Sequence, residues 1–396
     1  MKSAVRNFAF IALCIAVSFT AAHAANDNSF RFVVLSDIHV GYNDSNWSSK
    51  YATAVNEIKA MTGASKPAAV FITGDITDSG YESGTYDPAG AGSTVPGQIT
   101  NFKNWIKNPL EAAGIPVYMI EGNHDGNHQS TASEFAAAVG IPLYQSINIQ
   151  KTHFVLTNGV PDNVSGEYGT KGGATWGIGQ AGQIDTAQLN WIENDLKSAA
   201  NTTAKVSIMM DHFPLFNGDS GGYEIQNTDY FGNVTNAGTK LRSWVQQYGV
   251  DMYLYGHRHA GAGLNIHDST TVLATFLSTV QDMDTVFDPA ANGHAYSFTT
   301  NVTATALMDR LAAGTAYTAA GTAAPVQTRG NNIGYDVFDV NDYTVSHYRQ
   351  LISGYYQGEY IGPQQEWSIT FVPEPVTFIL LAVGGFAVLR RRKALK

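Results

Sequence analysis

Five short segments of this sequence carry side chains of the types that bind metal ions. In chain order they are Asp37-Ile38-His39, Gly74-Asp75-Ile76-Thr77-Asp78, Gly122-Asn123-His124-Asp125, Asp211-His212 and Gly256-His257-Arg258-His259. Imidazole and carboxylate groups bind borderline cations such as Zn, Mn and Fe. A carboxylate can also bridge two ions that lie about 3.5–4 Å apart, and such a pair clamps a phosphoryl oxygen and makes hydroxide from water at neutral pH. The residue types therefore suit a two-metal hydrolytic centre.

Each segment taken alone is weak support for a metal site. An isolated Asp-x-His or Gly-His-x-His pattern can be a turn, and a single histidine is more often a core or surface residue. The joint order carries more weight, because four of the eleven histidines fall at expected ligand positions. These four are His39, His212, His257 and His259, and His124 stands beside another expected ligand.

Each segment follows an apolar run of strand length. The runs are residues 32–35, 70–73, 117–120, 206–210 and 252–255, rich in β-branched or aromatic side chains and bounded by Gly, Asp or Asn. Ligands of open α/β sheets bind at the carboxyl ends of the strands, so we expect the five runs to deliver these residues to that edge. Gly74, Gly122 and Gly256, which precede proposed ligands, fit sharp turns or close approach of the backbone to a ligand.

Helical spacing of apolar residues occurs between the strands. Residues 51–61, 99–112 and 188–198 are the predicted helices, and the strand–helix alternation favours an α/β core. Three segments rich in Gly, Ser or Asn predict long loops, at residues 78–97, 159–182 and 217–238. Residues 266–348 contain β-like runs and a helical piece near 304–313 whose places in the fold the sequence does not define.

The ordered pattern D-x-H, G-D-x-x-D, G-N-H-D, H and G-H-x-H over residues 37–259 resembles that of the calcineurin-like metallophosphoesterase family. The resemblance implies an α/β fold with four layers, an α/β/β/α sandwich. It also implies two divalent or transition-metal ions (Mn, Fe or Zn). The implied ligands are Asp37, His39, Asp75 and His259 for one ion, and Asp75, Asn123, His212 and His257 for the other, with Asp75 bridging. His124 is implied to contact phosphate and protonate the leaving group, and Asp125 to orient His124.

For several further residues the sequence allows two interpretations. Purple acid phosphatases, a branch of the family, have a metal-binding Tyr where this chain has Asp78, so we assign no purple-type centre. Asp78 is expected to support the ligands or to be a solvated loop acid. Arg258 is expected either to contact phosphate or to have a structural or surface role. Asp211 is expected either to orient His212 or simply to be capped by local hydrogen-bond donors. Tyr223, Tyr230 and Phe231 either stack on an aromatic leaving group or only pack their own loop.

The first 24 residues predict a secretory signal peptide. Lys2 and Arg6 precede the apolar residues 8–17, and Ala22-His23-Ala24 is a small-residue cleavage site, so the mature chain is expected to begin at Ala25. An uncleaved membrane anchor is the alternative, but the apolar run is short. The single cysteine, Cys14, lies in this segment. Cysteine ligands and disulfides are therefore excluded from the mature chain.

The last segment, residues 372–396, resembles the PEP-CTERM sorting signal of Gram-negative bacteria. It combines Pro373-Glu374-Pro375, the apolar residues 376–389 and a cluster of arginines. The resemblance implies cleavage by an exosortase, transient membrane contact through the tail, and a periplasmic, outer-surface or extracellular location. A membrane helix is the alternative, but these residues would span only about 21 Å of a hydrocarbon core of roughly 30 Å.

The remaining residues 25–371 are expected to form one phosphoesterase domain with a β-rich C-terminal part. Removing both ends takes away seven basic residues and one acidic residue, which leaves a formal charge of −16. Such a field repels large nucleic acids, so a small phosphate ester is the expected substrate. The expected reaction is hydrolysis of a phosphate mono- or diester by attack of a metal-bound hydroxide. The alternative is a catalytically silent phosphoesterase scaffold that acts as a secreted envelope or matrix binding protein.

Overall fold

The computed structural model of the chain describes twelve segments within residues 27–371. They are residues 27–40, 47–77, 97–125, 132–160, 182–215, 224–228, 233–257, 263–266, 274–277, 317–318, 334–352 and 365–371. Several predictions fall outside the described residues. They are the signal peptide (1–24), the sorting segment (372–396), the helical piece near 304–313, Asp78, Tyr223, Tyr230, Phe231, Arg258 and His259.

The first sheet contains the strands that precede the first three motifs. Its order is β13-β12-β11-β1-β2-β3. The bounds are β1 Ser29–Leu35, β2 Pro67–Thr73, β3 Val117–Ile120, β11 Gly334–Asn341, β12 Thr344–Leu351 and β13 Gln365–Thr370. β1, β2 and β3 are parallel, whereas β11 lies antiparallel to β1 and continues into an antiparallel meander. The β-rich C-terminal part therefore extends the first sheet.

The second sheet contains the strands that precede the last two motifs. Its order is β10-β8-β9-β7-β6-β5-β4. The bounds are β4 Gln145–Ile149, β5 Thr152–Leu156, β6 Val206–Met210, β7 Met252–Tyr255, β8 Gly263–Ile266, β9 Ala274–Leu277 and β10 Tyr317–Thr318. β5, β6, β7 and β9 are parallel. The carboxyl ends of β6 and β7 therefore lie at one edge of this sheet.

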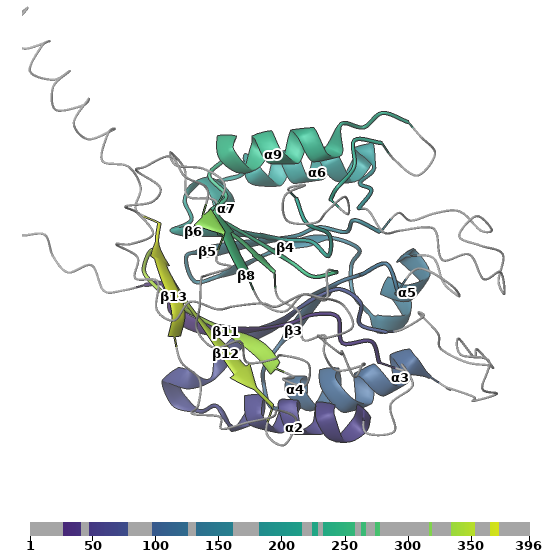
Figure 1. Cartoon of the computed structure of the whole chain (residues 1–396), viewed down its shortest axis with the longest axis vertical. Helices are drawn as coiled ribbons and strands as arrows, with labels where there is room; N and C mark the ends of the chain where they lie inside the picture. The colour runs from purple at the N-terminus through teal and green to yellow at the C-terminus, as the bar shows by residue number, and fades with distance from the viewer. Residues whose placement is uncertain are drawn as a thin grey trace, which may run out of the picture.

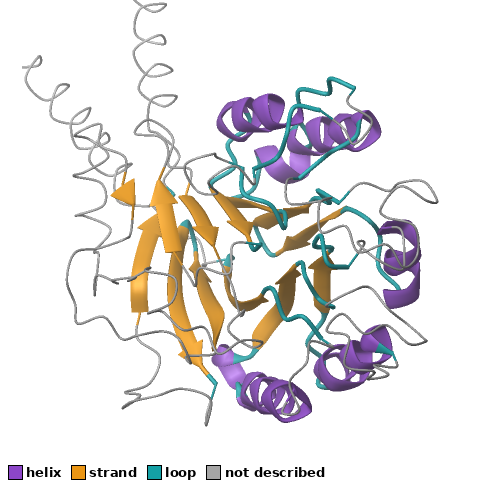
Figure 2. Cartoon of the chain, turned by 45° about the vertical axis from the view of Figure 1, so that its right-hand side comes forward, coloured by secondary structure: helices purple, strands orange, loops and turns teal. Residues whose placement is uncertain are grey.

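Helices cover the outer face of each sheet (Figures 1 and 2). Those on the first sheet are α2 Trp47–Ala60, α3 Gln98–Phe102, η2 Lys103–Lys107, α4 Asn108–Ala112 and α5 Ala132–Val139, with the short turn η1 Gly63–Ser65 before β2. Those on the second sheet are α6 Thr186–Leu196, α7 Ala199–Thr202 and α9 Ala237–Gln247. The described part of the chain includes no helix long and apolar enough to cross a membrane. The order of layers is α/β/β/α, which confirms the predicted fold class.

The layers follow from the two-residue period of the strands. In β1, Val33 and Leu35 face the helices, while Phe32 and Val34 face the second sheet. The core between the sheets is aromatic, with the rings of Phe32 and Phe338 stacked at a centroid distance of 4.8 Å. Both faces of β1 are thus buried, and its position in the middle of the molecule fixes the loop that follows it.

A polar network closes the end of the sandwich at which β1 begins. Buried Asn28 donates from its Nδ2 to Asp342 O, between β11 and β12, at 2.6 Å. Its Oδ1 accepts from Lys151 N at 3.2 Å and from Thr152 Oγ1 at 3.0 Å, at the start of β5. Lys205, just before β6, forms ion pairs with Asp27 and Asp342 at 2.6 and 2.5 Å. This network, which we call the N-terminal clamp, joins the two sheets at this end.

The element predictions were correct for the main strands and incomplete elsewhere. β3, β6 and β7 have the predicted bounds, and β1 and β2 start three residues earlier than predicted. The five strands do not share one sheet edge, because β1, β2 and β3 belong to one sheet and β6 and β7 to the other. The predicted helix 99–112 is a continuous run of α-, π- and α-helical turns, and α9 begins where a loop was predicted to end.

Candidate metal centre

The loops after β1 and β2 run side by side at the carboxyl ends of their strands. Asp37 N donates to Gly74 O at 3.0 Å, and His39 N donates to Asp75 O at 2.9 Å. The loops after β6 and β7 are tied in the same way, because Gly256 N donates to His212 O at 3.0 Å. Backbone hydrogen bonds therefore hold two neighbouring loops together in each sheet.

Asp37 connects the two sheets at this end. Its buried carboxylate accepts from His257 N, in the loop after β7, through Oδ1 at 2.8 Å. Its Oδ2 accepts from Ser36 Oγ at 2.5 Å. Sequence reasoning had not singled out Ser36, whose signal was a hydroxyl residue placed between an apolar strand and a proposed ligand. The two pairs of loops consequently meet around one carboxylate.

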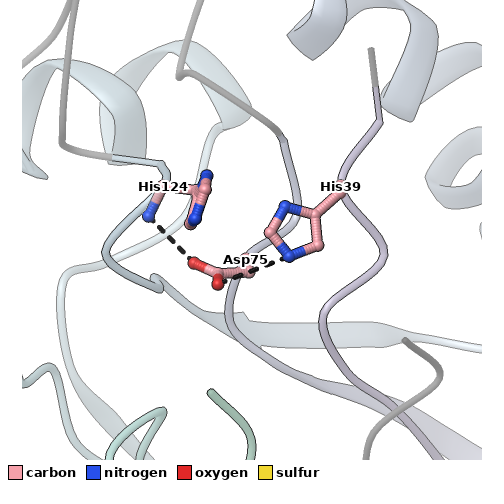
Figure 3. A group of neighbouring side chains, drawn as sticks. All are labelled: His39, Asp75 and His124. Atoms are coloured by element: carbon pink, nitrogen blue, oxygen red, sulfur yellow. Dashed lines mark hydrogen bonds and ion pairs between the residues drawn. The ribbon is translucent and has the colours of Figure 1, made fainter. Parts of the chain in front are cut away.

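Asp75 lies at the centre of the cluster and is fully buried. Its Oδ2 lies 3.6 Å from His39 Nε2 and 3.3 Å from His212 Nε2, and its Oδ1 accepts from His124 N at 2.9 Å. Figure 3 shows the carboxylate between the backbone of His124 and the ring of His39. Two groups of potential ligands form here, each with its ligand atoms within 4.8 Å of one another. They are His39, Asp75 and His124, and Asp75, His212 and His257, so Asp75 belongs to both.

The atoms around His212 form a set of acceptors. Its Nδ1 lies 2.8 Å from the carbonyl oxygen of Thr73, which can only accept, so Nδ1 carries a proton. In the neutral imidazole, Nε2 then directs a lone pair at Asn123 Oδ1, 3.0 Å away, and at Asp75 Oδ2. His257 Nδ1 also lies 2.8 Å from Asn123 Oδ1. Converging lone pairs repel unless a cation lies among them, so this donor set fits a metal ion.

The electrostatic field at the same place favours positive charge. Burial by itself lowers the pKa of His212, but the negative charges of Asp75 and Asp37 outweigh burial and raise this pKa to about 9. A proton on a fully buried imidazole is normally disfavoured. The field that stabilises it would stabilise any other cation at this position, which is a second indication that the residues fit a metal.

His124 lies at the edge of the first group. It is half-buried, and its ring is nearly perpendicular to that of His39, with centroids 4.5 Å apart. Its backbone N–H is directed at Asp75, whereas its ring is near the ligand atoms of His39 and Asp75. The side chain can thus reach either a cation or a substrate bound to it, and the predicted general-acid role stays a prediction.

The buried carboxylate of Asp125 binds backbone groups of two loops. Its oxygens accept from Ile76 N, Thr77 N, Thr77 Oγ1 and Gly122 N at 2.7–3.0 Å. Burial and the charge of Asp75 raise its pKa to about 6, against the lowering effect of the backbone hydrogen bonds. Its predicted role, orientation of His124, stays a prediction.

Asp211 is capped. It accepts from Thr157 Oγ1 at 2.6 Å and from Phe213 N at 3.0 Å, while the Thr73 carbonyl oxygen holds the His212 ring. Burial raises the pKa of Asp211 to about 6. Of the two interpretations considered for Asp211, the structure therefore shows the capping role, and His212 takes its orientation from the opposite sheet.

The backbone of the cluster is unusually strained. Asp37, His39, Asp75 and His257 have φ values of 50°, 44°, 46° and 71°, in the left-handed region that few non-glycine residues adopt. Gly122 and Gly256 allow the close packing, because a Cβ atom on them would lie 2.2 Å from Asp75 N and 2.1 Å from Ser36 Oγ. Such strain persists where the surrounding structure enforces it, and it concentrates at functional sites.

The comparison with known families agrees with this cluster. The family model of the calcineurin-like phosphoesterases matches residues 30–261, which include every residue of the cluster and the strands β2 to β7. This chain belongs to the calcineurin-like phosphoesterase family. No curated protein shows significant sequence similarity to it. The divalent cations that calcineurin-like phosphoesterases typically use match the His and Asp groups around Asp75.

Three solved structures are similar to this chain at low sequence identity. GAP50, the anchor in the inner membrane complex of Plasmodium, is 12% identical with a TM-score of 0.48, over 87% of this chain and 90% of that chain. The purple acid phosphatase PPD1 from yellow lupin (Lupinus luteus) seeds is 13% identical with a TM-score of 0.44, over 86% and 54%. Vacuolar Protein Sorting 29 from Cryptosporidium parvum is 11% identical with a TM-score of 0.33, over 86% and 100%.

Proposed function

We propose that this chain is a phosphoesterase that hydrolyses phosphate mono- or diesters with two divalent or transition-metal cations, Mn, Fe or Zn. The observation that carries the proposal is the position of Asp75, whose carboxylate belongs to both groups of potential ligands. A carboxylate shared in this way suits the bridging of two ions. His212 and His257 complete the second group, and Asn123 Oδ1 lies within 3.0 Å of a ring nitrogen of each. The Thr73 carbonyl directs the lone pair of His212 Nε2 inward.

The bound cations would neutralise charge on the phosphoryl oxygens and lower the pKa of a water molecule. The protein's own part is to hold these groups rigidly, since phosphoryl transfer depends chiefly on positioning and electrostatics. His124 holds a proton for the leaving oxygen at the half-exposed edge of the cluster. The remaining predicted ligand, His259, would join Asp37 and His39.

The proposed setting is outside the cytoplasm of a Gram-negative bacterium. Its support is the sequence of the two ends: a signal peptide before Ala25 and an exosortase-type sorting segment after residue 371. The acidic body favours a small substrate over a large nucleic acid. Membrane contact is then limited to the tail before it is removed.

The test measures metal content and turnover of residues 25–371, with Asp75→Asn as the variant and Asp185→Asn as the matched control. Asp185 is an exposed residue that caps α6 and accepts from Gln188 N. We expect about two bound ions in the wild type and the control. Asp75→Asn is expected to bind fewer ions and to lose hydrolysis of bis(p-nitrophenyl) phosphate and p-nitrophenyl phosphate.

Two results would contradict the proposal. Wild-type turnover and a full metal content in Asp75→Asn would show that the shared carboxylate is not the bridge. A wild type that binds two ions but hydrolyses none of the mono- or diesters offered, nucleotides and phospholipid head-group esters included, would be a silent scaffold that acts by binding.

A further inference from the structure

Reciprocal hydrogen bonds between carboxylates and backbone N–H groups join the loops after β2 and β3. Asp75, in the loop after β2, accepts through Oδ1 from His124 N in the loop after β3. In the opposite direction, Asp125, after β3, accepts from Ile76 N at 3.0 Å and from Thr77 N at 2.7 Å. Each loop thus supplies an acid that binds the backbone of the other loop.

Asp125 has a hydrogen-bond donor for each of its lone-pair positions. Oδ1 receives the Thr77 amide and the Thr77 hydroxyl, and Oδ2 receives the amides of Ile76 and Gly122. A carboxylate offers about four such positions, so the site is built for the ionised form. Bonds to an ionised acceptor are shorter and stronger than neutral ones, and this carboxylate is fully buried.

These hydrogen bonds between the loops begin where the regular pairing of β2 with β3 ends. β2 and β3 pair in parallel up to Thr73 and Ile120, and the proposed ligands Asp75 and Asn123 come two and three residues later. The loops are also in direct contact, because a Cβ atom on Gly122 would lie 2.2 Å from both Asp75 N and Asp75 Oδ1. A small change in loop separation would therefore move the bridging carboxylate relative to Asn123.

We propose that Asp125 is a positioning residue that clasps the two loops, and that it acts on the reaction through the separation of Asp75 and Asn123 rather than through the His124 ring. This inference rests on the proposed metal-dependent function. It predicts that loss of Asp125 weakens metal binding, whereas loss of a residue that orients the general acid would leave metal binding intact.

The variant is Asp125→Asn, made in residues 25–371. It keeps the shape of the side chain but replaces one acceptor oxygen by an NH2 group, which would face the backbone N–H donors. Residues that support metal ligands typically change metal affinity or activity about 10–100-fold. We expect the Kd for Mn²⁺ to rise about tenfold or more, and activity to recover as Mn²⁺ reaches saturation. The ratio of rates for p-nitrophenyl and alkyl phosphate esters is expected to stay at the wild-type value.

The matched control is Asp251→Asn, because Asp251 also accepts a backbone N–H, from Ser207 at 2.8 Å, but precedes β7 at the other end of the strand. It should leave the Kd for Mn²⁺ unchanged. If Asp125→Asn does not fold, Thr77→Val serves instead, since it removes the hydroxyl bond to Asp125 at 2.8 Å and keeps the backbone N–H of residue 77. We expect a rise of about threefold in Kd from this one bond, again with recovery at saturating Mn²⁺.

Two outcomes would overturn the proposal that Asp125 clasps the two loops. One is a folded Asp125→Asn, or Thr77→Val, with the wild-type Kd for Mn²⁺. The other is an Asp125→Asn variant with full metal content whose losses are much larger for alkyl than for p-nitrophenyl esters, which would assign Asp125 to the orientation of His124. Failure of the underlying function is distinguishable, because the wild type would then bind no Mn²⁺ or hydrolyse no ester.

Discussion

Removal of the Asn28 side chain should destabilise the protein without damaging the metal centre. Asn28 is fully buried in the N-terminal clamp, where its amide binds Asp342 O, Lys151 N and Thr152 Oγ1. The variant Asn28→Ala loses all three bonds. It leaves the metal centre untouched, because β1, seven residues long, separates Asn28 from Asp37 by about 23 Å.

The magnitude follows from the partners that lose their bonds. Each hydrogen bond contributes about 1 kcal/mol net, and a buried group left without a partner costs about 1–3 kcal/mol. The Thr152 hydroxyl is buried, whereas Lys151 is exposed and its amide can turn to water. The expected loss is therefore about 2–4 kcal/mol, a large share of a typical unfolding free energy of about 5–15 kcal/mol.

Urea unfolding of residues 25–371, followed by tryptophan fluorescence, measures this loss. The matched control is Asn190→Ala on the exposed face of α6, which should change the unfolding free energy by less than about 0.5 kcal/mol. Ester hydrolysis by Asn28→Ala at 25 °C should equal that of the wild type. A loss below about 1 kcal/mol with an unchanged m-value would show that the clamp adds little to the cohesion of the sheets.

Three further predictions concern the reaction, pH and processing. His124→Ala should keep its metals and lose about 10²–10⁴-fold with alkyl esters but much less with p-nitrophenyl esters, and equal losses would leave only phosphate positioning. Burial raises the pKa of half-buried Asp251 to about 7, so this carboxyl group reduces stability as the pH rises from about 4 to about 7. Asp251→Asn should then stabilise the protein by about 1–2 kcal/mol at pH 8 and not at pH 4, in thermal unfolding at both pH values. In the native host, intact mass should match a chain that starts near Ala25 and lacks the tail beyond Pro373, and retention of residues 376–396 would indicate a membrane helix.

The strands before the motifs were predictable because their signal is local. Residues 117–120, 206–210 and 252–255 are short apolar runs followed by Glu121, Asp211 and Gly256, and their bounds in the structure are the predicted ones. The division of the five strands between two sheets is not local, since it depends on β11 pairing with β1 from about 300 residues away. The approach of His257 N to Asp37 depends on how the sheets stack, and no spacing in the sequence encodes it.

Side-chain roles were harder to predict than side-chain types. Asp125 and Asp211 were recognised as acids near ligands, but their partners are mostly backbone amides of turns that form only in the folded chain. Ser36 was missed because a serine between a strand and a loop is common. The π-helical turn at Lys103–Lys107 has no sequence signal that separates it from ordinary helix.

The left-handed backbone at Asp37, His39, Asp75 and His257 has a consequence for how this protein tolerates mutation. Strain of this kind costs about 1–3 kcal/mol per residue, and glycine relieves it because glycine has no Cβ. Among the other residues, Asn, Asp and His adopt this conformation more often than most. The replacement that the backbone accepts most readily at these positions is therefore glycine, which removes the carboxylate or the imidazole. Such a replacement would also leave buried donors without their acceptor, for example His124 N after loss of the Asp75 carboxylate, at a cost of about 1–3 kcal/mol. A descendant that has lost the reaction would therefore gain thermal stability only where the replacement relieves the strain and keeps the hydrogen bonds of the cluster.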